Sequence, residues 1–262
     1  MSDQAVSGES IESPSAPPRN FAYETTTHLE LEQIIDGRYR VLSLLGKGGM
    51  GSVYRVQTVP DKHEFALKTL NPGSVTETTW RRFQKEAKAA ELLDHPALIK
   101  VHDFGLIDDK QPFFVMDLFE GENLAALIKE HGPLTFDRTI DVFFPVCQGL
   151  GYSHQKGVIH RDIKPSNIMV ANLDNPPLLT VKIVDFGIAK MRTTEDDESM
   201  TLTRTGEVFG TPFYMSPEQC LGQALDHRAD IYSLGCVMFE SLTGLPPFMG
   251  ESALSTMMKH QS

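Results

Sequence analysis

The stretch LLGKGGMGSVYRV, residues 44–56, restricts the fold of this chain more than any other part of its sequence. Its glycines, Gly46, Gly48 and Gly51, have the spacing G-x-G-x-x-G. Two unrelated phosphate-binding structures use this spacing: the strand-to-helix turn of a dinucleotide-binding fold, and a strand-to-strand flap over ATP. The residues that follow the third glycine distinguish the two.

Residues 52–56, directly after Gly51, have the alternating pattern of a strand and no helical stripe. A dinucleotide-binding fold requires a helix at the third glycine, because the helix N-terminus must face the pyrophosphate. A Walker-type loop requires a lysine after its last glycine, where this chain has Ser52. The pattern therefore favours a hairpin whose glycines let the backbone approach phosphates closely, although the same spacing also occurs in ordinary tight turns.

The sequence around the glycines predicts a small sheet with one helix. Segments rich in Val, Tyr, Leu and Phe predict strands at 39–45, 52–57, 63–70, 95–108 and 111–119. Good helix formers, with Phe83, Ala87 and Ala90 near helical spacing, predict a helix over 75–94. The expected order is strand, strand, strand, helix, strand, strand.

Composition sets the broad class of protein. The 262 residues are 40% apolar and 23% charged, which is typical of a globular chain with one large domain or two small lobes. The net charge of -11 argues against nucleic acid as a partner, since phosphate binding depends on clustered lysines and arginines. No segment has the roughly 18 apolar residues that span a bilayer, and the three cysteines include no C-x-x-C pair. A cytoplasmic protein with reduced thiols and no zinc site is expected.

Residues 1–36 differ in character from the rest of the chain. They are rich in Ser, Pro and Glu, and one arginine against seven acids gives them a net charge of -6. Such a segment cannot bury enough apolar surface to order itself. A disordered acidic tail is therefore expected, with either a solubilising or a regulatory role.

Further motifs follow the glycines in a fixed order. They are FALK with Ala66 and Lys68, HRDIKPSN from His160 to Asn167, DFG from Asp185 to Gly187, GTPFYMSPE from Gly210 to Glu218, and HRADIYSLG from His227. In this order they resemble the protein kinase family from about Tyr39 onward. Within that family, the sequence is similar to the eukaryotic-like serine/threonine kinases of bacteria. The resemblance implies a bilobal α+β fold. A small antiparallel sheet lobe with one main helix is expected at 37–119, and a mostly helical lobe at 120–262.

The resemblance also implies the catalytic groups. Phosphoryl transfer depends on positioning and charge neutralisation more than on covalent chemistry. Lys68 would contact the α- and β-phosphates of ATP and be held by a helix glutamate. Glu86 and Glu91 are the candidates, and FQKEA matches the family at Glu86. Asp162 would orient the substrate hydroxyl and accept its proton, and Lys164 would neutralise the transferring phosphoryl group.

Metal ligands and the type of substrate are implied in the same way. Asn167 and Asp185 offer an amide oxygen and a carboxylate, which are ligands that Mg2+ prefers, with Mn2+ as the alternative ion. Lys164 within KPSN is typical of serine/threonine kinases, and Thr211 would position the substrate by bridging Asp162 and Lys164. The implied partners are ATP, a divalent metal ion and protein substrates.

The implied nucleotide site draws on both lobes. Val53 and Ala66 would lie above the adenine and Met169 below it, while Met116 would guard the back pocket. The other nucleotide contacts would come from the glycine loop and from the connector between the lobes: Leu45, Gly46, Lys47, Gly48, Gly49, Met50, Gly51, Asp117 and Phe119. The last two would bind the adenine edge through their backbone.

Arg161, beside the catalytic acid, indicates regulation. A buried arginine is costly unless an anion pairs with it. The segment 185–218 contains Thr203 and Thr205, and a phosphate on either would supply that anion, as in relatives that autophosphorylate. Weaker candidates are Thr201 and Ser199, and an ordinary flexible polar loop is the alternative. Autophosphorylation would bring two copies of the chain together as a dimer.

The sequence is expected to contain only part of the second lobe that the resemblance implies. A long helix at 134–157, a buried helix at 228–244 and a last helix with one apolar face at 252–262 are predicted. Asp230 in the buried helix needs hydrogen bonds, and in the family it holds the HRD turn. Relatives continue with further helices, so either the polypeptide continues or the product is truncated.

The leading interpretation is an ATP-dependent protein serine/threonine kinase. The first alternative is an inactive kinase-like fragment or pseudokinase that acts as a binding module, although Lys68, Glu86, Asp162, Asn167 and Asp185 are all present. The second alternative is a nicotinamide-dependent enzyme, which rests on the glycines alone. A membrane anchor after residue 262 would be compatible with the leading interpretation.

Overall fold

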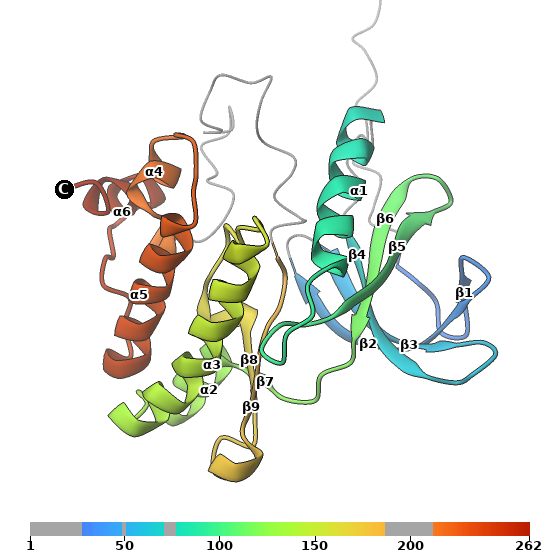
Figure 1. Ribbon diagram of the computed structural model, residues 1–262, viewed down its shortest axis with the longest axis horizontal. Helices are drawn as coiled ribbons and strands as arrows, with labels where there is room; N and C mark the ends of the chain where they lie inside the picture. The colour runs from blue at the N-terminus through green and yellow to red at the C-terminus, as the bar shows by residue number, and fades with distance from the viewer. Residues whose placement is uncertain (1–27, 49–50, 71–76, 187–211) are drawn as a thin grey trace, which may run out of the picture.

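A computed structural model describes residues 28–48, 51–70, 77–186 and 212–262. Two parts lie side by side in it (Figure 1). One contains a sheet of strands with one helix, and the other contains a group of helices with a second, smaller sheet. This division confirms the predicted α+β fold with two lobes.

The first lobe is built on an antiparallel sheet with the strand order β1-β2-β3-β4-β6-β5. Its strands are β1 (Ile34–Ile35), β2 (Tyr39–Gly48), β3 (Gly51–Thr58), β4 (Glu64–Leu70), β5 (Val101–Ile107) and β6 (Gln111–Asp117). The five strands expected from the sequence are present. The fourth of them is shorter than expected, because residues 97–99 contact the second lobe.

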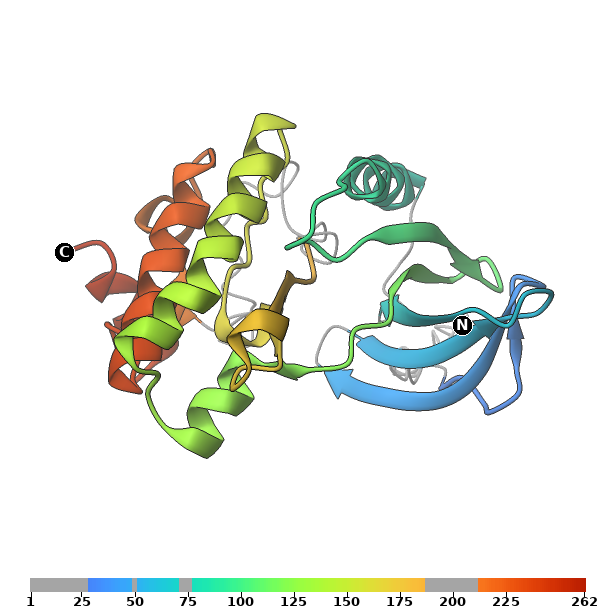
Figure 2. The same cartoon turned by 60° about the horizontal axis from the view of Figure 1, so that its bottom comes forward.

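Successive side chains of a strand point to opposite sides of a sheet. In this sheet, apolar residues occupy both sides. Leu67 and Val56 belong to a buried cluster on one face. Ala66 and Phe114 belong to another cluster on the opposite face, which packs against α1 (Glu77–Glu91). Figure 2 shows α1 lying along that side of the sheet. The helix is therefore held on the side of the sheet from which Glu86 reaches Arg161 of the second lobe.

The N-terminal boundary of the folded part differs from the prediction of a tail over residues 1–36. Leu29 and Ile35 are 7% and 2% exposed and join the outer cluster of the sheet. The N–H of Leu29 donates to the hydroxyl of Tyr54 at 3.2 Å, and β1 pairs with β2. The acidic composition of the segment obscured a few apolar residues that fit this sheet. The folded part begins no later than Leu29, and residues 1–27 lie outside the described part of the chain.

The residues that follow α1 form backbone hydrogen bonds with a strand of the second lobe. The N–H of Ile99 donates to the carbonyl of Ile183 at 2.9 Å, and the N–H of Ile183 donates to the carbonyl of Ala97 at 2.8 Å. Leu98 and Ile183 thus form an isolated parallel bridge between the lobes. The residues just after α1 are fixed to the strand that leads into the DFG motif.

The second lobe contains the remaining elements of the described chain. They are β7 (Glu122–Asn123), α2 (Leu124–His131), α3 (Phe136–Gln155), η1 (Pro165–Asn167), β8 (Ile168–Ala171), η2 (Pro176–Leu178), β9 (Thr180–Ile183), η4 (Pro212–Tyr214), α4 (Pro217–Cys220), α5 (Arg228–Thr243) and α6 (Ala253–Lys259). The small sheet has the order β7-β8-β9. Among the described residues, no helix combines the length and apolar character needed to cross a membrane.

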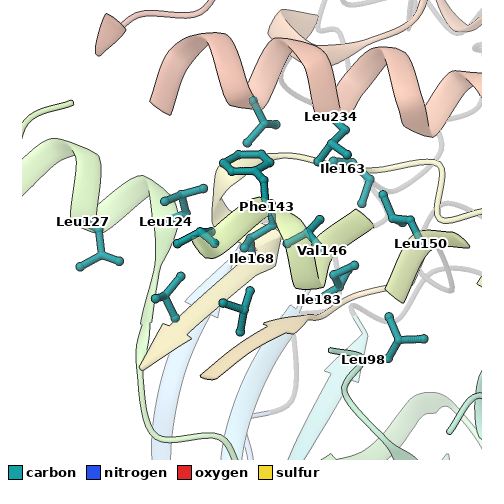
Figure 3. Close-up of a cluster of buried hydrophobic side chains, with 14 of the residues drawn as sticks. Leu98, Leu124, Leu127, Phe143, Val146, Leu150, Ile163, Ile168, Ile183 and Leu234 are labelled. Atoms are coloured by element: carbon teal, nitrogen blue, oxygen red, sulfur yellow. The ribbon is translucent and has the colours of Figure 1, made fainter. Parts of the chain in front are cut away.

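The core of the second lobe lies around α3, as Figure 3 shows. Phe143, Val146 and Leu150 recur at helical spacing on its buried face. They pack in one cluster with Ile168 of β8 and Leu234 of α5. The predicted helices at 134–157 and 228–244 are confirmed as α3 and α5, and their packing supports the loop between α3 and β8.

Candidate active site

The glycine-rich stretch forms the expected hairpin between β2 and β3, with Gly48 opposite Gly51. Packing requires a glycine at 51, because φ is 153° and an added Cβ would lie 1.8 Å from the carbonyl oxygen of Thr69. At Gly46 no heavy atom lies within 4 Å of an added Cβ, and at Gly48 the nearest lies at 3.9 Å. The open space beside these two glycines leaves their backbone accessible, as a phosphate contact would need.

Four residues of the predicted nucleotide site gather in one apolar cluster of the first lobe: Val53, Ala66, Met116 and Phe119. Met169 lies on β8 of the second lobe and is half-buried. The structure therefore places these side chains on elements of both lobes. Of the other predicted contacts, Leu45 and Lys47 are exposed on β2 on either side of Gly46.

Asp117 is fixed at the start of the connector between the lobes. Its N–H donates to the carbonyl of Lys100 at 3.0 Å, and its carboxylate lies 2.6 Å from Nε2 of His102. Because this N–H already has a partner, the predicted contact with the adenine edge would have to use the carbonyl oxygen of Asp117.

The loop before β8 brings three of the predicted catalytic residues together. Nζ of Lys164 lies 2.8 Å from Oδ2 of Asp162. The side-chain amide of Asn167 donates to the backbone carbonyl of Asp162 at 2.8 Å and to Oδ2 at 3.3 Å. Ile163, between them in the chain, is buried in the core of the second lobe. A carboxylate with a cation and an amide around it is thus held on a rigid support.

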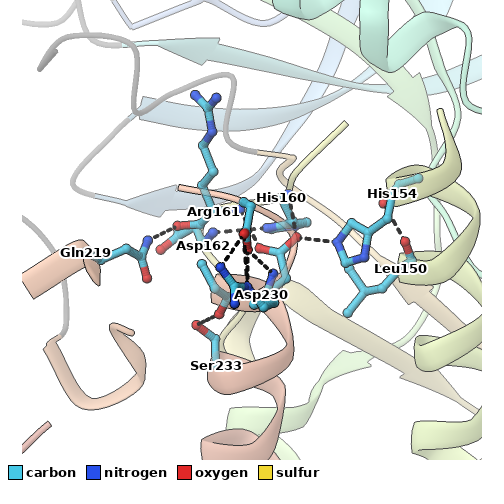
Figure 4. A network of polar contacts seen from close by, with 12 residues as sticks. Leu150, His154, His160, Arg161, Asp162, Gln219, Asp230 and Ser233 are labelled. Carbon is cyan, nitrogen blue, oxygen red and sulfur yellow. Dashed lines mark hydrogen bonds and ion pairs between the residues drawn. The ribbon is translucent and has the colours of Figure 1, made fainter. Parts of the chain in front are cut away.

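Asp230 of α5 holds this loop from below, as Figure 4 shows. Its two carboxylate oxygens accept the N–H groups of His160 and Arg161, each at 2.8 Å. One of them also contacts Nε2 of His154 at 2.7 Å. Burial alone would raise the pKa of the Asp230 carboxyl. The hydrogen bond from His154 and the backbone N–H groups of His160 and Arg161 counter burial, and the pKa lies below its usual value.

His160 connects the catalytic loop to the DFG segment. Its Nε2 donates to the carbonyl of Val184 at 2.9 Å, and its Nδ1 accepts the N–H of Asp162 at 3.3 Å. Its ring centroid lies 4.7 Å from that of Phe186, which is buried. Burial lowers the pKa of His160, although Asp230 opposes this shift. The ring is therefore neutral, with the proton on Nε2.

The ion pairs of Lys68 and Glu86 differ from those expected. Nζ of Lys68 lies 2.5 Å from Oδ2 of Asp185, and Oε1 of Glu86 lies 3.6 Å from Nη1 of Arg161. In the described part of the chain, Lys68 and Glu86 do not form the predicted pair with each other. The match of FQKEA to the family favoured Glu86 over Glu91 from sequence, but the cation that its carboxylate reaches, Arg161, lies far away in the chain. Burial raises the pKa of Glu86, and Arg161 partly opposes that shift.

Asn167 and Asp185 fit the role of metal ligands. The amide nitrogen of Asn167 is committed to Asp162, so its oxygen is the atom that it can offer to a cation. The N–H of Val184 donates to the backbone carbonyl of Asn167 at 2.9 Å, which places Asn167 beside the residue that precedes Asp185. An amide oxygen and a carboxylate are suitable ligands for a hard divalent ion.

Several predicted residues lie outside the described part of the chain: Gly49, Met50, Ser199, Thr201, Thr203, Thr205 and Thr211. Besides the ion pair of Lys68 with Asp185, the contacts of His154 with Asp230, of Glu86 with Arg161, and of Gln219 with the catalytic loop were not foreseen. A polar residue on the buried side of a long helix could have indicated His154. Nothing in the sequence alone indicates the others, because they join segments far apart in the chain.

Comparison with known proteins agrees with this geometry. The family model for the protein kinase domain matches residues 39–262. The serine/threonine-protein kinase pkn3 of Myxococcus xanthus is 44% identical over 224 residues, which are 85% of this chain and 41% of that protein. PknB of Mycobacterium tuberculosis is 39% identical over 230 residues, 86% of this chain and 36% of that protein. The chain thus spans about two fifths of the length of these curated relatives.

Solved structures show the same fold. The crystal structure of the PknI kinase domain of Mycobacterium tuberculosis has a TM-score of 0.68 and 29% identity. The match covers 84% of this chain and 79% of that one.

The two lobes and the charged groups between them define a protein kinase domain. The chain belongs to the protein kinase family, and the curated relatives that it matches are serine/threonine-protein kinases. ATP and a divalent metal ion are used generally in this family. The nicotinamide-dependent alternative is wrong, because a strand and not a helix follows Gly51.

Proposed function

We propose that the protein transfers the γ-phosphoryl group of ATP to serine and threonine hydroxyls of protein substrates. The observation that carries this proposal is the grouping of Asp162, Lys164 and Asn167 in one loop, with the amide of Asn167 and the ammonium of Lys164 both on the Asp162 carboxylate. Such a group orients a hydroxyl and neutralises charge, which are the requirements of phosphoryl transfer.

Each side chain then has a distinct role. Asp162 accepts the hydrogen bond of the attacking hydroxyl and takes its proton late in the reaction, since a carboxylate is a weak base. Lys164 lies beside Asp162 and neutralises the transferring group. Lys68 binds the α- and β-phosphates beneath the glycine hairpin. Bound to Asp185 and Asn167, a Mg2+ ion would neutralise the phosphate charge, and Mn2+ is the alternative ion.

The proposed cycle requires the ion pairs of Lys68 and Glu86 to change partners. Lys68 is held by Asp185 in the structure, and Glu86 by Arg161. With nucleotide and metal ion bound, Asp185 would hold the metal ion, and Lys68 would hold the phosphates with Glu86 as its partner. Arg161 then exchanges the Glu86 carboxylate for a phosphate. Phosphorylation of Thr203 or Thr205 within the 185–218 segment, by a second copy of the chain, would supply that anion.

Phosphorylation can be tested with the variant Thr203→Ala/Thr205→Ala. If phosphate on these residues activates the enzyme, the variant has lower activity than phosphorylated wild type and equals phosphatase-treated wild type. Equal activity of the variant and phosphorylated wild type would remove these threonines from regulation.

Phosphoryl transfer itself is tested with labelled ATP, divalent metal ion and a basic protein substrate. Wild type should label serine and threonine but not tyrosine, consistent with Lys164 in KPSN. Asp162→Asn should lose about a thousandfold or more in kcat while retaining nucleotide binding, because it removes the hydroxyl-orienting carboxylate. A wild-type protein that binds ATP without any transfer would favour the alternative of a binding module.

A further inference from the structure

The backbone of Arg161 is strained at the point where it sets the direction of Asp162. Its φ is 65°, in the left-handed region that residues with a side chain seldom occupy. Such a conformation persists only where surrounding bonds enforce it. The N–H of Arg161 is held by Asp230 at 2.8 Å. Its carbonyl oxygen belongs to the peptide group between Arg161 and Asp162, so a bond to this oxygen helps to fix the direction of Asp162.

The carbonyl of Arg161 is held by Gln219 of α4. Nε2 of the Gln219 side chain donates to this oxygen at 2.9 Å, as Figure 4 shows. The two residues are 58 positions apart in the chain. Gln219 also lines, together with Arg161, Asp162 and Tyr214, a hollow beside the catalytic carboxylate. A side chain at the end of the segment that follows the DFG motif thus reaches back to the catalytic loop.

The same side chain has a second, local role. Oε1 of Gln219 accepts the N–H of Ser216 at 3.0 Å, and the hydroxyl of Ser216 accepts the N–H of Gln219 at 3.3 Å. This reciprocal pair is a capping box at the start of α4. The box fixes the position of the amide group, so that Nε2 points to the loop. The Oε1 atom of Gln219 thus caps the helix, and its Nε2 atom donates to the carbonyl of Arg161.

We propose that Gln219 is a positioning residue that couples the end of the 185–218 segment to the catalytic loop by fixing the Arg161–Asp162 peptide group. Asp230 and Gln219 hold this strained residue from its two sides, one through the N–H and the other through the carbonyl. When α4 is displaced, the carbonyl is released and Asp162 loses its fixed direction. This inference rests on the proposed kinase function.

Three variants separate the positioning role from the capping role. In Gln219→Glu the carboxylate still accepts the N–H of Ser216, and a negative charge at a helix N-terminus is favourable, but the donor to Arg161 is lost. In Gln219→Met both bonds are lost at similar volume. In Ser216→Ala the capping hydroxyl is lost while both bonds of the Gln219 amide are kept.

The coupling predicts that kcat falls about fivefold in Gln219→Glu and Gln219→Met, with KM for ATP unchanged, and stays near wild type in Ser216→Ala. A purely capping role predicts the reverse, a normal Gln219→Glu and an impaired Ser216→Ala. Gln223→Glu is the matched control, because it makes the same change on an exposed residue just after α4.

A pH profile adds a readout that a structural role would not change. In Gln219→Glu the introduced carboxyl group can donate to the carbonyl of Arg161 only when it is protonated. The kcat of this variant relative to wild type should therefore rise as pH falls from about 8 to about 5, while Gln219→Met shows no recovery. The charged groups beside this position in the hollow are Arg161 and Asp162. A ratio for Gln219→Glu that is independent of pH would contradict the proposal.

Hydrogen exchange tests the coupling without phosphoryl transfer. In the full-length protein, the amides of residues 160–163 should exchange faster in Gln219→Glu and Gln219→Met than in wild type, Ser216→Ala or Gln223→Glu. Unchanged exchange in both Gln219 variants would overturn the proposal even in an active enzyme. If wild type transfers no phosphate, the proposed function fails, and the exchange measurement still decides whether Gln219 fixes the loop.

Discussion

At the scale of single residues, Asp230 organises the catalytic loop. A buried carboxylate is costly unless hydrogen bonds compensate for its lost hydration. Here His154 and the N–H groups of His160 and Arg161 supply that compensation. In return the carboxylate fixes two successive peptide groups next to Asp162. The sequence indicated this role for Asp230 through the family resemblance, and the structure confirms it, while the contribution of His154 appears only in three dimensions.

The Asp230→Asn variant should unfold more easily by about 3 kcal/mol, because an amide cannot accept all three donors and leaves buried groups unpaired. Its kcat should fall as well, since the loop that carries Asp162 loses its support. Urea unfolding and steady-state kinetics measure the two effects. Asp226→Asn is the control, because that carboxylate pairs with Arg228 at the surface, where ion pairs contribute little. Equal stability of Asp230→Asn and wild type would contradict the account.

His160 should make the stability of the protein depend on pH. Its folded-state pKa is lowered by burial, so below about pH 6.5 the unfolded chain binds a proton that the buried ring does not. Stability therefore falls as pH decreases through that range, with a slope of up to about 1.4 kcal/mol per pH unit from this residue. Above that pH the contribution is constant.

Unfolding of His160→Gln at several pH values measures this slope. The variant should be less stable than wild type at neutral pH but lose less stability on acidification. His63→Gln, at an exposed position on the β3–β4 turn, should follow wild type. Parallel pH curves for His160→Gln and wild type would rule out the proton linkage.

At the scale of elements, α1 carries Glu86, and the position of the helix determines which cation this carboxylate can reach. Nζ of Lys100 donates to the carbonyls of Glu91 and Leu93 at 2.9 Å and 3.3 Å, which fixes the C-terminal end of the helix. Glu86, more than one turn earlier, reaches Arg161 of the other lobe. For Glu86 to pair with Lys68, its carboxylate would have to leave Arg161, while the bonds of Lys100 lie at the C-terminal end of the helix.

Glu86→Gln should therefore lower kcat/KM by about tenfold or more, because Lys68 would have no carboxylate to hold it in the active arrangement. Glu91→Gln is the matched control, since Glu91 is exposed at the last turn of the same helix and its carbonyl, not its side chain, bonds to Lys100. Kinetics with varied ATP measure both variants. A larger loss in Glu91→Gln than in Glu86→Gln would show that the other candidate holds Lys68.

Elements with a strong local pattern could be predicted from the sequence, and contacts between distant elements could not. Alternation at 52–57 and helical spacing around Phe83 predicted β3 and α1, because local periodicity reflects burial on one face. The motifs placed Asp162 and Asn167 in one loop. The partner of Lys68 in the structure, Asp185, could not be predicted, because the pair joins two lobes whose relative position local patterns do not reveal. The packing of Leu29 was missed because its surroundings are acidic.

At the scale of the whole molecule, the site is divided between two lobes, which the described residues join through backbone bonds of Ala97 and Ile99 with Ile183. Lys68 comes from the first lobe and Asp162 from the second, and the bridge at Leu98 and Ile183 joins the lobes beside the DFG segment. A ligand that contacts both sides should therefore stabilise the molecule as a unit, since binding to the folded state alone raises the free energy of unfolding.

ATP with Mg2+ should raise the unfolding midpoint of the wild-type protein. At a ligand concentration of about 100 times Kd the gain is about 2.7 kcal/mol, or roughly 5 to 10 °C for a domain of this size. Thermal unfolding with ATP and Mg2+, with either alone, and with neither measures the effect. The variant Lys68→Met should lose most of the gain in stability, because it removes the cation that binds the phosphates.

The control is Lys62→Met, at an exposed position in the β3–β4 turn, which should keep the gain. A gain of equal size in both variants would contradict the assignment of Lys68 to the nucleotide. A gain with Mg2+ alone would show that the metal ion stabilises the protein without the nucleotide.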